Sequence, residues 1–188
     1  RSQCLRTIAG ELSRLSSHLI GTGVFGQDVG VLVTSVMWGF NWREEVITVL
    51  DDLTGARMMY NFMRPGGVNQ DSPEGWSDKV RKVMDGLPRH IEDFNNLMTT
   101  NEIFQTRTRG IGILSREDAL AFSTSGPTLR GSGVKYDIRR AHPYGIYPEL
   151  DFDIPVGEMG DCADRYLVRI AEMEQSRRII LQCLDRLD

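Results

Sequence analysis

Asp28 is the residue whose position in the sequence points most directly to chemistry. It is the only formally charged side chain between Leu15 and Trp42, with His18 taken as neutral, and its neighbours are apolar and helical in pattern. We therefore expect the carboxylate to be at least partly buried, where it needs a hydrogen-bonding partner or an altered pKa. Such carboxylates gather at functional sites, although from the residues alone a cap at the start of the following helix is the favoured interpretation.

The segment Gly21–Gly26 matches the pattern GxGxxG, which binds dinucleotides when a strand leads into it and a helix follows. An amphipathic helical pattern leads into this segment instead. We therefore reject a dinucleotide site and interpret the glycines as small residues that allow helices to pack closely.

Metal-binding patterns do not stand out in the sequence. The three histidines, His18, His90 and His142, lack the i, i+3 or i, i+4 spacing of a helical metal pair, and the three cysteines are far apart with no CxxC. We therefore expect no metal site in this chain. A polar contact within the fold is the simpler interpretation of each histidine.

Apolar residues that recur every three or four positions predict a mainly α-helical bundle. The first such stretch runs from Leu5 to Leu19, with Glu11 among the residues off its apolar face. The second runs from about Val31 to Arg57. Its first half is apolar on all sides, which predicts that this half is buried all around.

Later parts of the chain are less regular. A third helix is expected over Trp76–Leu97, with an interruption near Gly86–Pro88, and Asp161 is expected to cap a last long helix. Residues 123–160 are rich in glycine, proline and aromatic residues. They predict an irregular excursion with only short strands, for example Phe152–Val156.

Composition limits the classes of function. The 188 residues are 40% apolar, which is enough for one substantial core. Lys and Arg number 22 against 26 Asp and Glu, so the basic surplus of nucleic-acid-binding proteins is missing and no nucleic-acid partner is expected. The basic cluster Lys135, Arg139 and Arg140 could be a solvated face or a contact between subunits. The longest uncharged runs fall short of the roughly 20 residues that a membrane span needs.

Short blocks in a fixed order carry a resemblance to a known family. They read ELSRLSSHL at 11–19, QDVG at 27–30, GARM at 55–58, RPGGV at 64–68, NEIFQTR at 101–107, LRGSG at 129–133, FDIPV at 152–156, GDC at 160–162 and DRYL at 164–167. Together they cover almost the whole chain and resemble the hydrogenase-like, quinone-site subunit (49 kDa type) of respiratory complex I, NADH:quinone oxidoreductase.

The resemblance implies a fold. Residues 1–188 are expected to be the central part of a single domain like the large subunit of nickel–iron hydrogenases, a mainly α-helical bundle, with N- and C-terminal parts outside this sequence. The absence of an initiator Met and the helical pattern of the last residues agree with this expectation. In the family, the His and Tyr that hydrogen-bond the quinone lie upstream of this segment.

The resemblance also implies site residues. Asp28 resembles the family's acid that orients the upstream quinone-site His, and Ile20 and Val24 resemble residues that line the quinone chamber. Their i, i+4, i+8 spacing places all three on one face if the helix continues through the glycines. Met59 stands where many family members place a His close to the terminal iron–sulfur cluster of a neighbouring subunit. A thioether cannot titrate, which puts a proton-linked cluster potential at this position in doubt.

The function implied by the resemblance is quinone reduction coupled to ion translocation in a multisubunit complex. Quinone is the substrate, NAD and the iron–sulfur clusters belong to partner subunits, and this chain binds no cofactor alone. The implied partners are the iron–sulfur subunit with the terminal cluster and the membrane subunit that completes the cavity. The subunit would lie peripherally on the cytoplasmic side of a bacterial or archaeal membrane, or on the matrix side in mitochondria.

Two alternatives stay open. One is the large subunit of a related membrane-bound nickel–iron hydrogenase, which CxxC pairs in flanking sequence would favour. The other is a non-catalytic scaffold subunit, which a solvent-facing Asp28 would favour.

Overall fold

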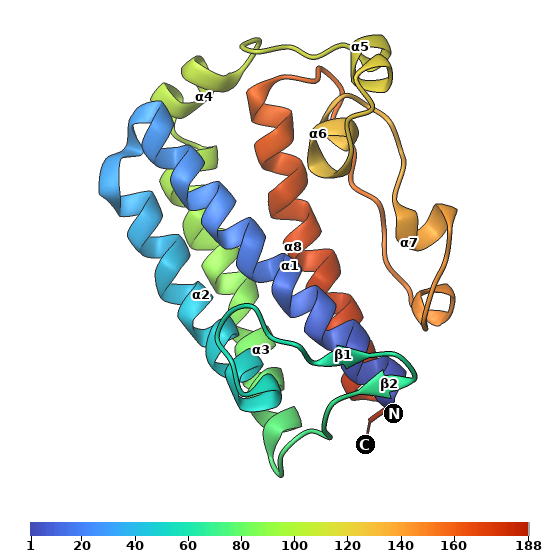
Figure 1. The fold of residues 1–188 in the computed structure, drawn as a ribbon. Coiled ribbons are helices and arrows are strands. Elements are labelled where there is room, and N and C mark those ends of the chain that lie inside the picture. Colours follow the sequence, from blue (N-terminus) through green and yellow to red (C-terminus); the bar gives the residue numbers. More distant parts are fainter. Residues whose placement is uncertain (188) are drawn as a thin grey trace.

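Four long helices form the framework of the chain in a computed structural model, which describes residues 1–187 with the exception of the Leu32 side chain (Figure 1). They are α1 (Ser2–Gly26), α2 (Leu32–Thr54), α3 (Trp76–Phe94) and α8 (Cys162–Leu184). Helix α1 packs on both α2 and α8, and α3 packs on the same two helices. The mainly α-helical class predicted from the sequence is confirmed.

Shorter elements connect the long helices. They are, in chain order, η1 (Gln27–Val31), β1 (Met63–Arg64), β2 (Gly67–Val68), η2 (Asn95–Thr99), α4 (Glu102–Thr108), α5 (Arg116–Ala121), α6 (Gly126–Gly131), α7 (Ile138–Ala141) and η3 (Tyr147–Glu149). Strands β1 and β2 form a small antiparallel hairpin in which Met63 pairs with Val68. Segment η1 is the kinked turn between α1 and α2, and α4 to α7 arch over one side of the bundle (Figure 1).

The core lies where the apolar faces of the long helices meet. The apolar positions predicted on α1 from Leu5 to Leu19 are at most 1% exposed, and the predicted face of α2 from Val46 to Leu53 is also buried. Burial of one such side chain contributes about 1.5–3 kcal/mol. Buried Trp76 begins α3 and donates its indole N–H to the carbonyl of Val49 at 2.8 Å, which fixes α3 against α2.

Glycines allow α1 and α2 to approach closely before the turn that joins them. A Cβ on Gly23 would lie 2.9 Å from the carbonyl oxygen of Ser35, and a Cβ on Gly39 would lie 2.5 Å from that of Leu19. At the turn, Gly30 has φ +101°, a conformation that L side chains rarely adopt. The interpretation of the GxGxxG segment as a close-packing surface is thus confirmed at Gly23.

The first half of α2 corrects one expectation. Val33, Met37 and Trp38 are 59%, 63% and 43% exposed, so this half is not buried on all sides within the chain. The reason is that α1 covers the face that carries Gly39 and leaves the other faces open. Although this half is apolar, no helix within residues 1–187 is long and apolar enough to cross a membrane.

The expected interruption of α3 near Gly86–Pro88 is wrong. The helix continues with Pro88 inside it. Proline cannot donate to the carbonyl four residues earlier, which is that of Met84. Arg177 of α8 donates its Nε–H to this carbonyl at 2.7 Å and so replaces the missing helical bond.

Residues 123–160 form an irregular excursion, as predicted, but with helical turns instead of short strands. Segment Phe152–Val156 is not a strand. One of its amides, that of Asp153, donates to the side chain of Gln175 on α8 at 2.9 Å, so the bond that a strand partner would provide comes from a helix. The prediction that Asp161 caps α8 is confirmed.

Candidate functional site

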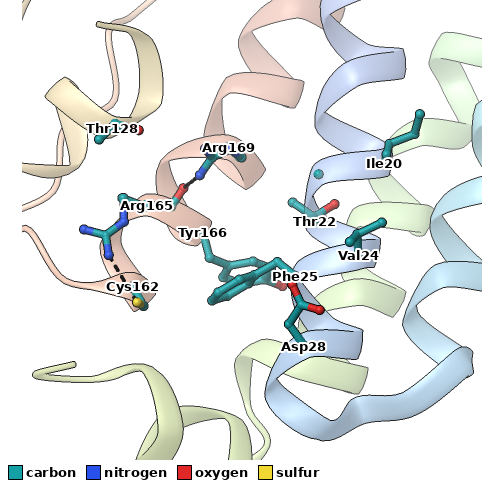
Figure 2. A pocket seen from close by; sticks show the side chains of 11 residues that line it. Ile20, Thr22, Val24, Phe25, Asp28, Thr128, Cys162, Arg165, Tyr166 and Arg169 are labelled. Atoms are coloured by element: carbon teal, nitrogen blue, oxygen red, sulfur yellow. Dashed lines mark hydrogen bonds between the residues drawn. The ribbon is translucent and has the colours of Figure 1, made fainter. Parts of the chain in front are cut away.

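A cavity of about 500 Å³ opens between the end of α1, segment η1, α6 and the first half of α8 (Figure 2). It is lined by Ile20, Gly21, Thr22, Val24, Phe25 and Asp28 on one side and by Thr128, Cys162, Arg165, Tyr166 and Arg169 on the other. The first group lies within residues 20–28, whereas the second comes from segments at least 100 residues later. A volume of this size fits a small organic ligand.

The structure brings together three of the residues singled out from the sequence. Ile20, Val24 and Asp28 all line the cavity, because α1 continues as a helix through its glycines as far as Gly26. Their i, i+4, i+8 spacing therefore places them around one space.

Asp28 corrects the expectation of a buried carboxylate. It is exposed, because it lies in η1 beyond the end of α1 and faces the open cavity. It does not cap the next helix either, since the N-cap of α2 is Val31, with no side-chain hydrogen bond. Within residues 1–187, no hydrogen bond or ion pair engages this carboxylate, which leaves it available to a partner outside the chain.

Aromatic rings pack where the two sides of the cavity meet. Phe25 of α1 stacks on Tyr166 of α8 with ring centroids 6.2 Å apart (Figure 2). Phe104 packs edge-on against Tyr166 at 4.9 Å. Burial raises the pKa of Tyr166 to about 12, although a hydrogen bond with Thr99 lowers it, so the phenol is neutral at physiological pH. This part of the cavity is apolar with one neutral hydroxyl.

The side opposite α1 carries cations that sequence reasoning missed. Arg165 donates to the carbonyls of Gly160 and Gly112 at 2.7 and 2.9 Å, and its Nη2 lies 3.1 Å from the sulfur of Cys162. Arg169 donates to the carbonyl of Arg165 at 2.7 Å. The cavity thus has an acid on one side and guanidinium groups on the other, an arrangement that can orient a ligand with polar groups at both ends of a flat ring.

A buried carboxylate lies one turn beyond Arg169. Glu172 is 1% exposed and accepts hydrogen bonds from Arg130 at 2.5 Å and from His18 at 2.7 Å. Burial raises the pKa of Glu172, but these two partners outweigh burial and hold it below its usual value. The interpretation of His18 as a residue with a polar contact inside the fold is confirmed.

A second buried group of charges fastens the excursion to α1. Arg139 contacts Glu11 and Asp137, and Tyr147 donates its hydroxyl to Glu11 at 2.7 Å. One expectation is therefore corrected. Arg139 belongs neither to a solvated face nor to a contact between subunits, since it is 1% exposed within the chain. Glu11, predicted only to lie off the apolar face of its helix, is fully buried.

Met59 is not part of the cavity. It lies in the loop between α2 and β1, is 94% exposed and has φ +57°. Among the described residues, no group of three or more His, Cys, Asp or Glu side chains is arranged to hold a metal ion.

The comparisons with known proteins agree on one family. Residues 28–188 match the family described as the respiratory-chain NADH dehydrogenase, 49 kDa subunit. The D-type subunit of the NADH-quinone oxidoreductase of Rhodospirillum centenum is 49% identical over 187 residues, and that of Desulforamulus reducens is 46% identical over 187 residues. A C/D-type subunit of the NADH-quinone oxidoreductase of Aquifex aeolicus is 43% identical over 188 residues.

The matches cover 100% of this chain but 47%, 51% and 32% of the three relatives, so the chain spans about half of their length or less. The family match extends from Asp28 to the last residue and includes the whole of α8. This chain therefore belongs to the family of the 49 kDa subunit of the respiratory-chain NADH dehydrogenase.

Proposed function

We propose that the cavity between α1, η1 and α8 forms part of the site at which a membrane-attached NADH:quinone oxidoreductase reduces quinone. The observation that carries this proposal is the meeting of Ile20, Val24 and Asp28 in one cavity. The family resemblance implies these three residues independently of the geometry. The names of the relatives, which are subunits of NADH-quinone oxidoreductases, give the same reaction class.

The lining of the cavity suits a quinone headgroup. Ile20, Val24 and Phe25 offer apolar surface to the ring and its substituents, and the neutral hydroxyl of Tyr166 adds little charge. The carboxylate of Asp28 has the free acceptor capacity to bind an imidazole that comes from outside this chain. A nearby anion favours imidazolium over imidazole, so Asp28 keeps such a histidine ready to donate a proton to reduced quinone.

The rest of the assembly follows from the family. Electrons reach the quinone from an iron–sulfur cluster in a neighbouring subunit, NAD is used in another subunit, and the cavity is completed by a membrane subunit. In this proposal the chain resembles part of a hydrogenase large subunit and lies peripherally on the membrane. Exposed Met59 faces the iron–sulfur subunit. The exposed apolar half of α2 supports an assembly in which further protein covers this chain.

One observation favours a second candidate, a scaffold subunit without a part in the reaction. Asp28 is exposed, which is what a scaffold role predicts. Exposure alone does not decide between the two functions, because a residue that meets a substrate or a partner histidine must also be accessible in the isolated chain. The two candidates differ in what the charge of Asp28 does for quinone reduction.

The deciding experiment is Asp28→Asn in the assembled complex, which keeps the size of the side chain and removes its charge. We expect quinone reductase activity to fall on the order of tenfold, because the partner histidine becomes a poorer proton donor. Electron transfer from NADH to artificial acceptors upstream of the quinone should be unchanged. Asp85→Asn is the matched control, since Asp85 is exposed on α3 and does not line the cavity. If an assembled Asp28→Asn complex reduces quinone at the wild-type rate, the proposed role of Asp28 is wrong and the scaffold role is supported.

A further inference from the structure

Glu172 is the point at which three elements of the fold are joined. It belongs to α8 and uses both carboxylate oxygens: Oε2 lies 2.7 Å from Nε2 of His18 on α1, and Oε1 accepts from Nε of Arg130 on α6 at 2.5 Å. These partners are 154 and 42 residues away in the sequence. All three side chains are buried, so the contacts are shielded from water.

Each of these three elements also contributes to the cavity, at a position close to the joined residues. The carbonyl of His18 accepts a hydrogen bond from the hydroxyl of Thr22 at 2.8 Å, and Thr22 lines the cavity. Arg169 precedes Glu172 by one turn of α8, and Thr128 lies at the start of α6. The carboxylate therefore joins α1, α6 and α8 directly behind the residues that face the cavity.

The charge of Glu172 also balances the cations on this side of the cavity. Burial lowers the pKa of Arg169, the charges of Arg165 and Arg130 lower it further, and the carboxylate of Glu172 opposes these effects. Arg130 itself is 4% exposed. Without the carboxylate, its nearest acidic partner would be Asp137 at 4.0 Å, which is too far for a hydrogen bond.

We propose that Glu172 is a positioning residue for quinone reduction, which holds α1 and α6 against α8 through His18 and Arg130 and so fixes the shape of the cavity. This inference rests on the proposed function. Glu172 does not line the cavity, so it acts through the residues that do. Its loss should change the binding of quinone more than the chemical step, because displaced walls weaken contacts made equally with the ground state and the transition state.

The test is Glu172→Gln in the assembled complex, with a short-chain ubiquinone as substrate. The amide keeps the volume but removes the charge, and its NH2 group would face the donor of either Arg130 or His18. We expect KM for the quinone to rise on the order of fivefold, with kcat within about twofold of wild type. Electron transfer to artificial acceptors upstream should not change. A wild-type KM would overturn the proposal, and so would an unchanged KM with a reduced kcat.

A matched control lies on the same helix. Glu174→Gln makes the same substitution two residues away, where the carboxylate is partly exposed and pairs with Arg177. It should leave KM and kcat unchanged. If Glu174→Gln and Glu172→Gln raise KM equally, the rise in KM comes from a general change in α8 and not from the loss of the contacts of Glu172 with His18 and Arg130.

A second pair of variants decides the matter if the Glu172→Gln complex does not assemble. His18→Leu removes one contact and leaves Glu172 paired with Arg130, whereas His18→Gln restores an N–H donor in the same direction. We expect His18→Leu to raise KM and His18→Gln to return it toward the wild-type value. Equal KM values for these two variants and wild type would contradict the positioning role.

Hydrogen exchange separates failure of this inference from failure of the proposed function. In the assembled Glu172→Gln complex, backbone amides of residues 20–28 should exchange faster, because α1 is held less firmly. Wild-type exchange with a wild-type KM overturns the positioning role, whatever Asp28→Asn does. If exchange rises but neither substitution alters quinone reduction, the cavity is not the quinone site and the proposed function is wrong.

Discussion

Arg139 and Glu11 are 128 residues apart in the sequence, yet Nη1 of the arginine lies 2.9 Å from Oε1 of the glutamate, and neither side chain is more than 1% exposed. Asp137 shares the same guanidinium at 2.6 Å. Arg139→Met would leave two buried carboxylates without this cation. Within residues 1–187, the cations that remain beside them are the partly exposed Arg14 at Glu11 and Arg130, 4.0 Å from Asp137. We expect a loss of about 3–5 kcal/mol in the free energy of unfolding, measured by urea unfolding of the chain.

Arg178→Met is the control for this prediction. Arg178 makes ion pairs with Asp151 and Asp153, but both acids are largely exposed. Pairs of this kind contribute about 0–1 kcal/mol each. A loss for Arg139→Met no larger than that for Arg178→Met would show that the buried group of charges does not hold the excursion to α1.

This buried group of charges also shows which features of the fold cannot be predicted from the sequence. The periodicity of α1 correctly predicts which apolar residues are buried, because that signal is local. The same periodicity places Glu11 off the apolar face, yet it is fully buried. Its burial depends on a cation, a hydroxyl from Tyr147 and the hydroxyl of Ser176, all more than a hundred residues later. Spacing within one helix carries no information about them.

One side of the candidate site could be predicted from the sequence, and the other side could not. Asp28 could be named from the sequence because its charge is isolated, and Ile20 and Val24 because the family resemblance implies that they line the quinone chamber. Their i, i+4, i+8 spacing then predicts that the three share one face. The opposite side could not, because Arg165 and Arg169 come to the cavity only through the packing of α8 on α1. Their helix was predicted, but nothing in its pattern says which turn faces the end of α1.

The predictions for Pro88 and for the first half of α2 were wrong for a related reason. Proline inside a helical pattern usually marks an end, but here Arg177 from another helix replaces the missing hydrogen bond of Met84. An all-round apolar stretch usually marks a buried helix, but Met37 and Trp38 remain exposed within this chain. In the first case a residue distant in sequence determines the outcome, and in the second α1 covers only one face of the helix.

His90 should make the stability of the chain depend on pH. It is buried and stacks on Trp42 with ring centroids 5.1 Å apart. Burial lowers its pKa to about 4, although the charge of Asp93 opposes this, while the ordinary value is 6.5. Between these two pH values the unfolded chain binds a proton that the folded chain does not. Stability is therefore complete above about pH 6.5 and falls by about 3 kcal/mol as the pH approaches 4.

Urea unfolding across this pH range checks the prediction. His90→Gln should reduce the slope of unfolding free energy against pH, because the amide does not titrate. His142→Gln is the control, since it makes the same substitution at an exposed position. Identical slopes for the wild type and His90→Gln would mean that His90 titrates normally in the folded state.

Gly39→Ala tests the close approach of α1 and α2. The added Cβ would lie 2.5 Å from the carbonyl oxygen of Leu19, so the two helices must separate. We expect a loss of about 1–3 kcal/mol in unfolding free energy. Gly21→Ala should have the opposite sign, because no atom lies within 4 Å of its Cβ and alanine favours a helix over glycine by about 1 kcal/mol. Equal effects of the two substitutions in urea unfolding would contradict the close packing seen here.

Met59→His, made in the assembled complex, tests the proposed position of this loop beside the neighbouring cluster. Met59 is 94% exposed within the chain and has φ +57°, a conformation that histidine adopts more readily than most residues. Imidazole titrates near neutral pH, and its positive charge would stabilise the reduced cluster. The midpoint potential of that cluster should therefore become more positive as the pH falls, in redox titrations at several pH values.

Met159→His is the control for a remote imidazole. Met159 is 61% exposed and lies in the excursion before α8, so a histidine there should leave the pH dependence of the cluster as it is in the wild type. The steepness of the effect depends on the distance between the two charges, because water and salt screen exposed groups beyond about 10 Å. If the potentials of Met59→His, Met159→His and the wild type change with pH in the same way, the Met59 loop does not lie beside the cluster.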